Sequence, residues 1–206
     1  MRTKSEARRR AILDAAAAVF RDLGFERASM ADICERVGFS KATLYSYFES
    51  KEELFFDVVM EATAAEFEAV HVALQSDEAD ITRALRLFGA RLLALLYSPP
   101  VQAVRRLVVS QAGRGGLGPR SFELGPARSE QAVAEFLARA MADGRLRPAD
   151  PHIAALHLRA LLEAEWLDRF MFQLITSAPD EAQAVPPVVE RAVAVFMAAY
   201  GPLPAA

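Results

Sequence analysis

The residues with the clearest chemistry lie in one short run near the start of the chain, residues 41–47. Lys41 and Thr43 can donate hydrogen bonds to base edges or phosphates, and tyrosine hydroxyls such as that of Tyr45 commonly donate to phosphate. On a helix, Leu44 would face inward and leave these donors outward. The run therefore indicates nucleic-acid binding rather than catalysis.

The charge of the chain is unevenly distributed. The net charge of -3 alone argues against a polyanionic partner. Residues 1–51, however, carry ten lysines and arginines against seven acidic residues, whereas the remainder carries fourteen against twenty. All three lysines, Lys4, Lys41 and Lys51, lie in the first segment. A basic head on an acidic body predicts that a polyanion binds at one end only.

A glycine-rich segment, Gly113–Gly118, matches the spacing G-x-G-x-x-G of dinucleotide sites. A dinucleotide fingerprint also needs a helix immediately after the glycines and a second strand nearby. Here Pro119 follows, and the next residues have helical periodicity. We therefore expect a loop and no nucleotide.

Other candidate catalytic or metal-binding residues have plainer interpretations. His152 and His157 are five residues apart and do not share a helix face. One cysteine, Cys34, and three scattered histidines make neither a disulfide nor a zinc site. A charged cluster is expected to be a solvated or interface helix face: Arg159, Glu163, Glu165, Asp168 and Arg169. We expect no enzyme, metal or cofactor.

Short helices separated by glycines must position the basic run. A first amphipathic helix, rather than a secretion signal, should end at Gly24. Ser29 should cap a second helix that stops at Gly38, and Ser40 should cap a third over residues 41–47. Two short helices joined by a tight glycine turn form a helix-turn-helix, whose second helix enters the major groove of DNA.

Lys51 stands at the start of the next predicted helix, where its charge and the free backbone N–H groups suit a phosphate. The predicted DNA-binding residues are Ser29, Ser40, Lys41, Ala42, Thr43, Tyr45, Ser46, Tyr47 and Lys51.

The rest of the chain also has helical periodicity and no β-alternation, so the predicted fold is all-α. We expect a three-helix DNA-binding domain over 1–50 and a larger helical domain over 51–206. A long helix from Lys51 to about Gln75 should join them. No stretch without charge approaches the ~20 residues that span a bilayer, so a cytoplasmic protein without membrane contact is expected.

The segment Ser29–Leu54 resembles the DNA-binding domain of the TetR/AcrR family of bacterial regulators. The matching positions are Phe25, Ile33, Gly38, Ser40, Thr43, Leu44, Tyr45, Phe48, Lys51 and Leu54. Cys34 departs from the small alanine usual there. Residues 125–151 resemble the C-terminal domain of one TetR subgroup. The resemblance implies a homodimer that offers one recognition helix to each half of a palindrome, and an effector pocket in the C-terminal domain.

Bulky apolar residues of the second half supply candidates for that pocket and for a dimer interface. The predicted pocket residues are Phe67, Phe88, Leu92, Phe122, Phe136, Trp166 and Phe170. The helix predicted over about 151–176 is apolar on two sides, so one side can pack in its own domain and the other against a partner. The predicted interface residues are Leu158, Leu162, Val189, Val193, Phe196 and Tyr200.

The function expected from these features is a transcriptional regulator that binds double-stranded DNA as a homodimer. A small apolar or aromatic effector should bind the second domain and release the operator. Two alternatives stay open: a helical small-molecule-binding protein or enzyme with a vestigial DNA-binding head, and an adaptor whose pocket is filled.

Overall fold

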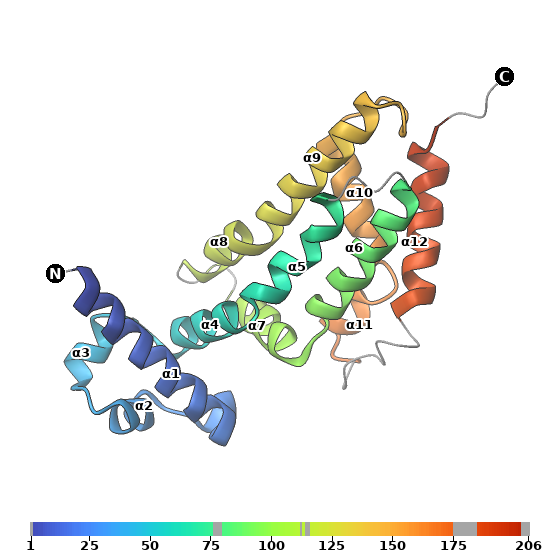
Figure 1. The fold of residues 1–206 in the computed structure, drawn as a ribbon. Coiled ribbons are helices and arrows are strands. Elements are labelled where there is room, and N and C mark those ends of the chain that lie inside the picture. The colour runs from blue at the N-terminus through green and yellow to red at the C-terminus, as the bar shows by residue number, and fades with distance from the viewer. Residues whose placement is uncertain (1, 76–79, 112, 114–115, 175–184, 203–206) are drawn as a thin grey trace. The chain divides into compact units, whose positions relative to one another are not determined.

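The computed structural model describes residues 2–75, 80–111, 113, 116–174 and 185–202. These residues form helices and no strand, which confirms the all-α prediction (Figure 1). The chain divides into two compact units, Met1–Ala64 and Ala65–Ala206.

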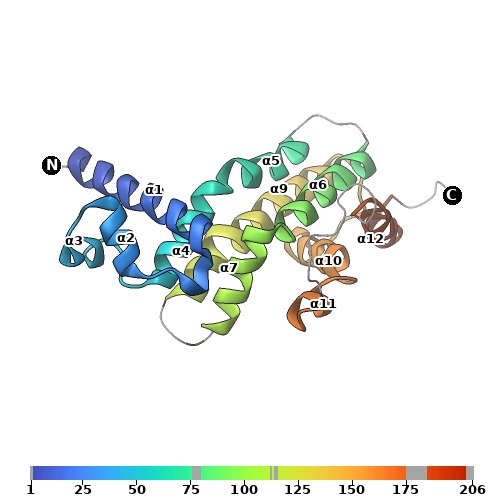
Figure 2. The ribbon, with the colours of Figure 1, turned by 90° about the horizontal axis from the view of Figure 1, so that it is seen from below.

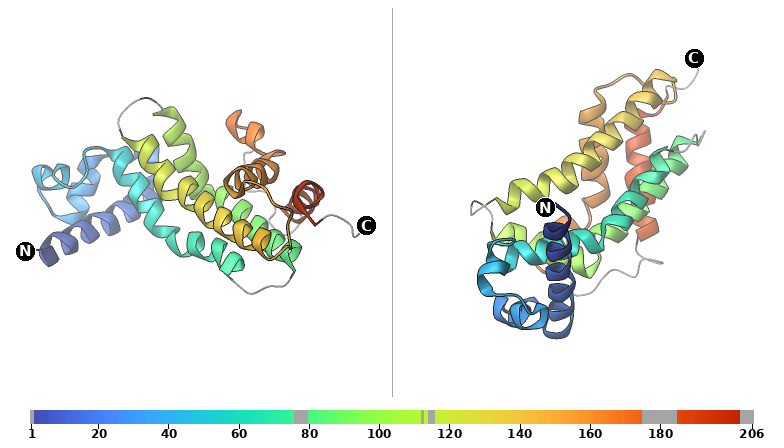
Figure 3. Two further views of the ribbon diagram at one scale, coloured as in Figure 1. Left: turned by 90° about the horizontal axis from the view of Figure 1, so that it is seen from above. Right: turned by 60° about the vertical axis from the view of Figure 1, so that its left-hand side comes forward.

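The first unit contains α1 (Arg2–Arg27), α2 (Met30–Val37), α3 (Lys41–Tyr45) and α4 (Lys51–Ala62). Figure 3 shows these four helices grouped together, in blue to cyan. They enclose one apolar core, made of Ile12, Leu13, Ala16, Val19, Phe20, Ala28, Ile33, Cys34, Leu44, Phe48 and Leu54. The helical path of α1 breaks at Gly24, which has φ 76° and ψ 160°. The sequence predicted a helix end at this residue, because glycine adopts a positive φ without steric cost.

The predicted long helix over 51–75 is two helices, α4 and α5 (Ala64–Gln75). Both the backbone N–H and the hydroxyl of Thr63 donate to the carbonyl oxygen of Val59, at 2.9 and 2.8 Å, and end α4 there. The predicted domain boundary at residue 50 also moves. Leu54 of α4 is fully buried in the first core, so α4 packs with the DNA-binding helices.

The second unit contains α5, α6 (Ile81–Leu96), α7 (Pro99–Ser110), α8 (Leu117–Phe122), the π-helix η1 (Glu123–Ala127), α9 (Arg128–Ala142), α10 (Pro151–Glu163), α11 (Leu167–Met171) and α12 (Val185–Tyr200). The helices α6, α9, α10 and α12 pack side by side (Figures 1 and 2). Of the glycine-rich segment, residues 114 and 115 lie outside the described residues, and Gly118 is already inside α8.

One glycine sets the approach of three of these helices. A Cβ atom on Gly89 of α6 would lie 2.7 Å from Leu162 of α10 and 3.1 Å from Val189 of α12. A larger residue at position 89 would therefore require the side-chain ends of Leu162 and Val189 to shift, and glycine lets the three helices pack without that adjustment. The core around it is built from side chains of α5, α6, α9, α10 and α12.

The helix predicted from Pro151 to about Thr176 also divides. It ends at Glu163, and α11 begins at Leu167 on a separate path (Figure 2). Between them Trp166 leaves the helical region and turns into the core, where its ring meets that of Tyr97 at 4.8 Å. Burial of a large aromatic side chain outweighs the small preference of these residues for a continuous helix. Residues 175 and 176 lie outside the described residues.

Within the described residues, no single helix is long and apolar enough to cross a membrane. Among the helices that the structure describes, one pair, α6 and α7, meets the length and composition of a span when taken together, and the two are bent by 68° at the break between them.

Candidate nucleic-acid interface and second-unit cavity

The helix-turn-helix begins with a complete capping box on α2. The N–H of Asp32 donates to the Ser29 hydroxyl oxygen at 3.2 Å, and the N–H of Ser29 donates to the Asp32 carboxylate at 2.8 Å. The hydrogen bonds from Ser29 lower the pKa of the Asp32 carboxyl group. Gly38 ends the helix with φ 74° and donates to the carbonyl oxygen of Cys34 at 2.9 Å. The sequence predicted both helix ends, and the structure confirms them.

The second helix of the motif, α3, is pinned at its start by Ser40. The Ser40 hydroxyl accepts from the N–H of Thr43 at 3.1 Å and lies 2.9 Å from the Thr43 hydroxyl. Leu44 is fully buried, as predicted, and holds α3 against the core. The helix ends at Tyr45 rather than at Tyr47, and the N–H of Tyr47 donates to the carbonyl oxygen of Leu44, three residues back, in a tighter turn.

Most of the predicted DNA-binding residues come together on this short segment. Lys41, Ala42, Tyr45 and Ser46 are exposed, with Tyr45 at 49%. Thr43 and Tyr47 are half-buried. An exposed lysine and an exposed tyrosine on a short, capped helix are suitable donors to a DNA backbone or base edge.

Tyr47 and Ser29 have other partners. The Tyr47 hydroxyl donates to the Ser5 hydroxyl of α1 at 3.4 Å. The Ser29 hydroxyl donates to Asp32 at 2.6 Å while it caps α2. In the structure Tyr47 therefore links the segment after α3 to α1, and Ser29 caps α2.

Lys51, which was predicted to bind a phosphate, contacts groups of its own chain in the structure. Its Nζ donates to the carbonyl oxygens of Phe25 and Ala28, at 2.8 and 3.0 Å, and lies 4.3 Å from the centre of the Phe25 ring. A positive charge and three donors satisfy the free carbonyl groups after the Gly24 break, where a helix end attracts cations. These contacts give the ammonium group partners within the fold.

We therefore predict that Lys51→Met lowers stability and leaves the salt dependence of DNA binding unchanged. Charged hydrogen bonds of this kind contribute about 1.5–3 kcal/mol, so the urea midpoint should fall accordingly. Lys41→Met is the matched control, because Lys41 is exposed. It should leave the midpoint unchanged and weaken DNA binding. If Lys51→Met instead has normal stability, and the salt dependence of its DNA affinity falls by about one phosphate contact, then Lys51 binds a phosphate of the DNA.

The arginines of α1 form ion pairs within the first unit that the sequence did not indicate. Arg9 donates to the buried carboxylate of Asp57 on α4 at 2.5 Å, and its guanidinium lies 5.4 Å from the centre of the Phe48 ring. Arg10 pairs with Asp14 and Glu61. Asp57 and Glu61, four residues apart on α4, were the sequence signal that could have indicated these ion pairs.

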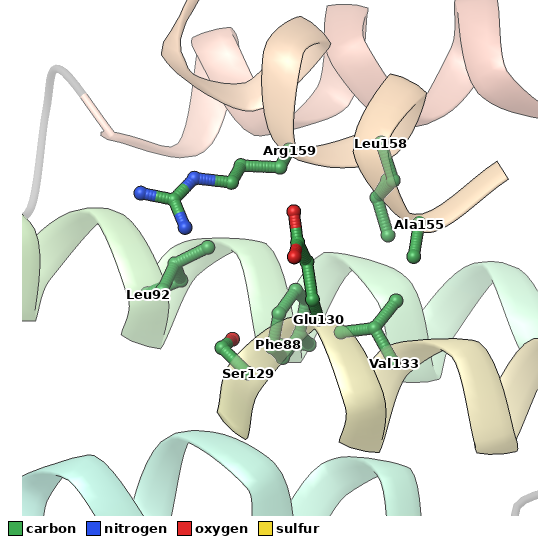
Figure 4. A pocket seen from close by; sticks show the side chains of 8 residues that line it. All are labelled: Phe88, Leu92, Ser129, Glu130, Val133, Ala155, Leu158 and Arg159. Atoms are coloured by element: carbon green, nitrogen blue, oxygen red, sulfur yellow. The ribbon is translucent and has the colours of Figure 1, made fainter. Parts of the chain in front are cut away.

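Two hollows differ in their suitability for a ligand. The wider one, about 340 Å³, is an open groove of the first unit between α1 and α2. Three carboxylates and one arginine line it, so its net negative charge would repel a phosphate. The other is a cavity of about 10 Å³ in the second unit between α6, α9 and α10 (Figure 4). It has room for about one water molecule, well below the ~300 Å³ or more of a typical ligand pocket.

The structure brings only two of the predicted pocket residues, Phe88 and Leu92, to this cavity. Phe136, Trp166 and Phe170 are packed in the core, and Phe122 is 54% exposed. Phe67 is half-buried against His71 and Arg128. Bulky residues were predicted as pocket lining from their size alone, but most fill space between helices. The sequence reasoning missed the polar lining, Ser129, Glu130 and Arg159.

A buried histidine lies beside this cavity. His71 Nδ1 donates to the carbonyl oxygen of Phe67 at 2.9 Å, so Nε2 accepts from the Ser129 hydroxyl at 3.0 Å. The ring also contacts Phe88. Burial lowers the pKa of His71 below its ordinary value of 6.5, and nearby Arg128 acts in the same direction. The pair ties α5 to α9 in the neutral state of the ring.

A pH dependence follows from the lowered pKa of His71. Below pH 6.5 the unfolded chain binds a proton that the folded chain resists. The free energy of unfolding should therefore fall as pH drops below 6.5 and should not change through this group above it. Urea unfolding between pH 5 and 8 measures the slope. The His71→Gln variant should flatten it and His152→Gln, at an exposed position, should not. The same slope in wild type and His71→Gln would contradict this assignment.

A buried charged network takes the place of the solvated or interface helix face that was expected around Glu163. Glu163 is 5% exposed and accepts from Arg105 at 2.7 Å and from the Tyr97 hydroxyl at 3.2 Å. Arg159 lies 3.4 Å from its second oxygen. Burial and the charge of Glu163 raise the pKa of Tyr97. The network joins α6, α7 and α10.

The residues predicted for the dimer interface are mostly the core of one protomer. Leu158, Leu162, Val189, Val193 and Phe196 are buried, and Tyr200 is half-buried. The structure instead leaves a different apolar set exposed, Ile153, Leu156, Leu167, Met171 and Val195. The sequence showed that these helices have two apolar sides, but it did not show which side is buried in the core of the protomer and which stays exposed.

A capped helix, a glycine turn and a short second helix with exposed donors, on a helical body, define the class of helix-turn-helix DNA-binding proteins. Residues 12–58 match the family described as bacterial regulatory proteins, tetR family. Residues 83–202 match the C-terminal domain of AefR-like transcriptional repressors. The chain therefore belongs to the TetR family of transcriptional regulators, which confirms the resemblance of residues 29–54 and the expectation of a regulator rather than an enzyme.

Individual relatives agree with this assignment. The A-factor receptor protein of Streptomyces griseus is 34% identical over 131 residues, 59% of this chain and 45% of that protein. The regulator UidR of Escherichia coli is 33% identical over 102 residues, 46% of this chain and 52% of UidR. The chain thus spans about half the length of the curated relatives it matches.

Solved structures match over nearly the whole chain. A TetR-family regulator of Mesorhizobium loti is 28% identical, with a TM-score of 0.79, over 96% of this chain and 98% of that one. The flavonoid-responsive regulator FrrA is 29% identical, with a TM-score of 0.70, over 97% of this chain and 100% of FrrA.

Proposed function

We propose that this protein is a repressor that binds a palindromic operator as a homodimer and leaves it when a small molecule binds the second unit. The observation that carries the proposal is the segment α2–turn–α3, which presents Lys41 and Tyr45 to solvent. Ser40 and Leu44 hold α3 in place, so its donors have a defined orientation. The protein acts in the cytoplasm, where its DNA target lies.

The homodimer is supported by the apolar surface that one protomer leaves exposed. Ile153 and Leu156 of α10 and Val195 of α12 are 46, 44 and 54% exposed. Small alanines, including Ala194 and Ala198, surround Val195 on α12. Two helices of one copy can pack against the same two of another as a four-helix interface. A two-fold dimer places two copies of α3 on a palindromic site.

Control by a ligand is supported by the second unit itself. Its cavity is bordered by α6, α9 and α10, and the His71–Ser129 hydrogen bond beside it ties α5 to α9. The break at Thr63 separates α5 from α4. A compound that favours another placement of α5 would shift the population away from the DNA-binding form. FrrA responds to flavonoids by its name, which favours an aromatic effector here.

The test begins with duplexes selected from a random DNA pool, followed by gel-shift titration of the selected site and a scrambled one. Lys41→Ala should weaken the selected site by about 1–3 kcal/mol if the side chain touches a base. Tyr45→Phe removes one hydroxyl and should weaken both sequences alike, because phosphate contacts carry no sequence information.

Arg86→Ala is the matched control for this test, since it removes one positive charge from the second unit. It should bind DNA as wild type does. Unchanged affinity in both the Lys41 and Tyr45 variants would exclude α3 as the recognition helix.

A further inference from the structure

The cavity of the second unit has polar groups that an apolar pocket does not need. Phe88 and Leu92 of α6 form its floor, and Val133, Ala155 and Leu158 complete the apolar lining. The half-buried Glu130 extends from α9, and its carboxylate points across the cavity toward α10 (Figure 4). Among the described residues it has no hydrogen-bond or ion-pair partner. A carboxylate above an aromatic floor can accept a hydrogen bond from a donor that enters the cavity.

An arginine borders the same cavity from the opposite helix. The Arg159 side chain extends from α10 over Leu92 (Figure 4). Its Nε lies 3.4 Å from Glu163, which already accepts a closer bond, at 2.7 Å, from Arg105. The two terminal nitrogens of Arg159 donate no hydrogen bond to a described residue. The guanidinium therefore keeps donors for an acceptor in the cavity.

The two groups together define what charge the cavity accepts. One carboxylate and one guanidinium leave its lining electrically neutral. A cationic ligand would meet Arg159 as well as Glu130, and an anionic ligand would meet Glu130 as well as Arg159, so for either ion a like-charge repulsion offsets the attraction. A neutral molecule with a donor at one end and an acceptor at the other satisfies both, and hydrogen bonds to charged groups are the stronger ones.

The backbone around Glu130 is also unusual. The π-helix η1, Glu123–Ala127, ends just before Ser129 and Glu130 at the start of α9. Such helices are rare and are frequent at functional sites. Pro126 inside it has no N–H to donate, which weakens the turn further. The segment that carries the two polar residues of α9 therefore begins where the helix can most easily adjust.

We propose that this cavity recognises a neutral aromatic compound with a phenolic hydroxyl that donates to Glu130 and a carbonyl oxygen that accepts from Arg159. The inference rests on the proposed function, in that the second unit is taken as the effector domain. Because the cavity is only about 10 Å³, it must widen. Glu130 and Arg159 are half-buried and can move outward, while Phe88, at 2% exposure, remains the floor.

The test uses a set of para-substituted biphenyls and isothermal titration of the full chain without DNA. The probe carries a hydroxyl on one ring and an acetyl group on the other. Its analogues replace the hydroxyl by methyl or by trimethylammonium, or the acetyl group by carboxylate. The probe should bind at least about tenfold tighter than each analogue.

Variants assign this preference to the two residues. Glu130→Gln keeps the shape of the side chain and should lower the affinity for the probe by about tenfold, with no effect on the methyl analogue. Arg159→Met should do the same and abolish the advantage of the acetyl group. Glu135→Gln is the control, because Glu135 lies on the same helix but bonds to Gln131 at the surface. This variant should leave the affinities for the probe and for its analogues unchanged.

Three results would overturn the proposal: equal affinity for the probe and its methyl analogue, tighter binding of either charged analogue, or no binding of the probe at millimolar concentration. Operator release is measured separately by gel shift. A probe that binds with the expected pattern but leaves the operator bound contradicts the release mechanism and not the site. Specific DNA binding without the phenol preference contradicts the site alone.

Discussion

Replacing Leu156 by glutamate should convert the protein from a dimer to a monomer and reduce operator affinity by about 100-fold or more. Leu156 is 44% exposed on α10, next to Ile153 on the same face. A carboxylate buried there against a second copy would lose its hydration without a partner, which costs several kcal/mol per ion. A monomer offers one α3 to the DNA and loses the gain from binding two half-sites at once.

Sedimentation should show the change directly, from about twice the chain mass to the 22.6 kDa of one chain. Val109→Glu is the matched control. Val109 is 49% exposed on α7, outside the proposed interface, so this variant should stay a dimer and bind the operator normally. If Leu156→Glu remains a dimer at micromolar concentration, the interface does not lie on this face of α10.

The second large effect is expected at Glu163. Removing this carboxylate by Glu163→Ala leaves Arg105, only 19% exposed, without its counter-charge, and deprives the Tyr97 hydroxyl of its acceptor. Breaking a buried ion pair from one side costs about 3–5 kcal/mol. Urea unfolding, followed by circular dichroism, should therefore show a much lower midpoint than in the wild-type protein.

Two further variants separate charge from size in this network. Glu163→Gln keeps a carbonyl oxygen for Arg105 but removes the charge, so its midpoint should fall between those of wild type and Glu163→Ala. Glu165 lies two residues after Glu163 and forms an exposed ion pair with Arg191. Glu165→Ala breaks this pair and should leave the urea midpoint unchanged, since water already solvates both groups. A Glu163→Ala midpoint close to that of wild type would show that water replaces the lost carboxylate.

The local features of the first unit could be predicted from the sequence because they depend on neighbours along the chain. Ser29 and Ser40 cap their helices, and Gly24 and Gly38 take the left-handed backbone that other residues avoid. Leu44 is buried and Tyr45 exposed, as helical spacing requires. These positions are set by hydrogen bonds within four residues, so local patterns are sufficient to find them.

The partners of charged side chains could not be predicted in this way. Lys51 bonds to the carbonyl oxygen of Phe25, 26 residues away, and Arg9 to Asp57, 48 residues away. A lysine at a helix start looks the same in sequence whether it faces a phosphate or a carbonyl of its own chain. Only the packing of α4 against α1 decides between these roles.

In the second unit the sequence determined that the helices are amphipathic, or apolar on two sides, and that they form a regulator of the TetR family. The tertiary structure decided which side is core. Leu158 and Val193 are buried, while Leu156 and Val195 remain for a partner. It also decided that Trp166 interrupts the α10–α11 segment and that Glu130 and Arg159 border one cavity. The physical reason is that burial depends on contacts between helices distant in sequence, which a hydrophobic pattern does not specify.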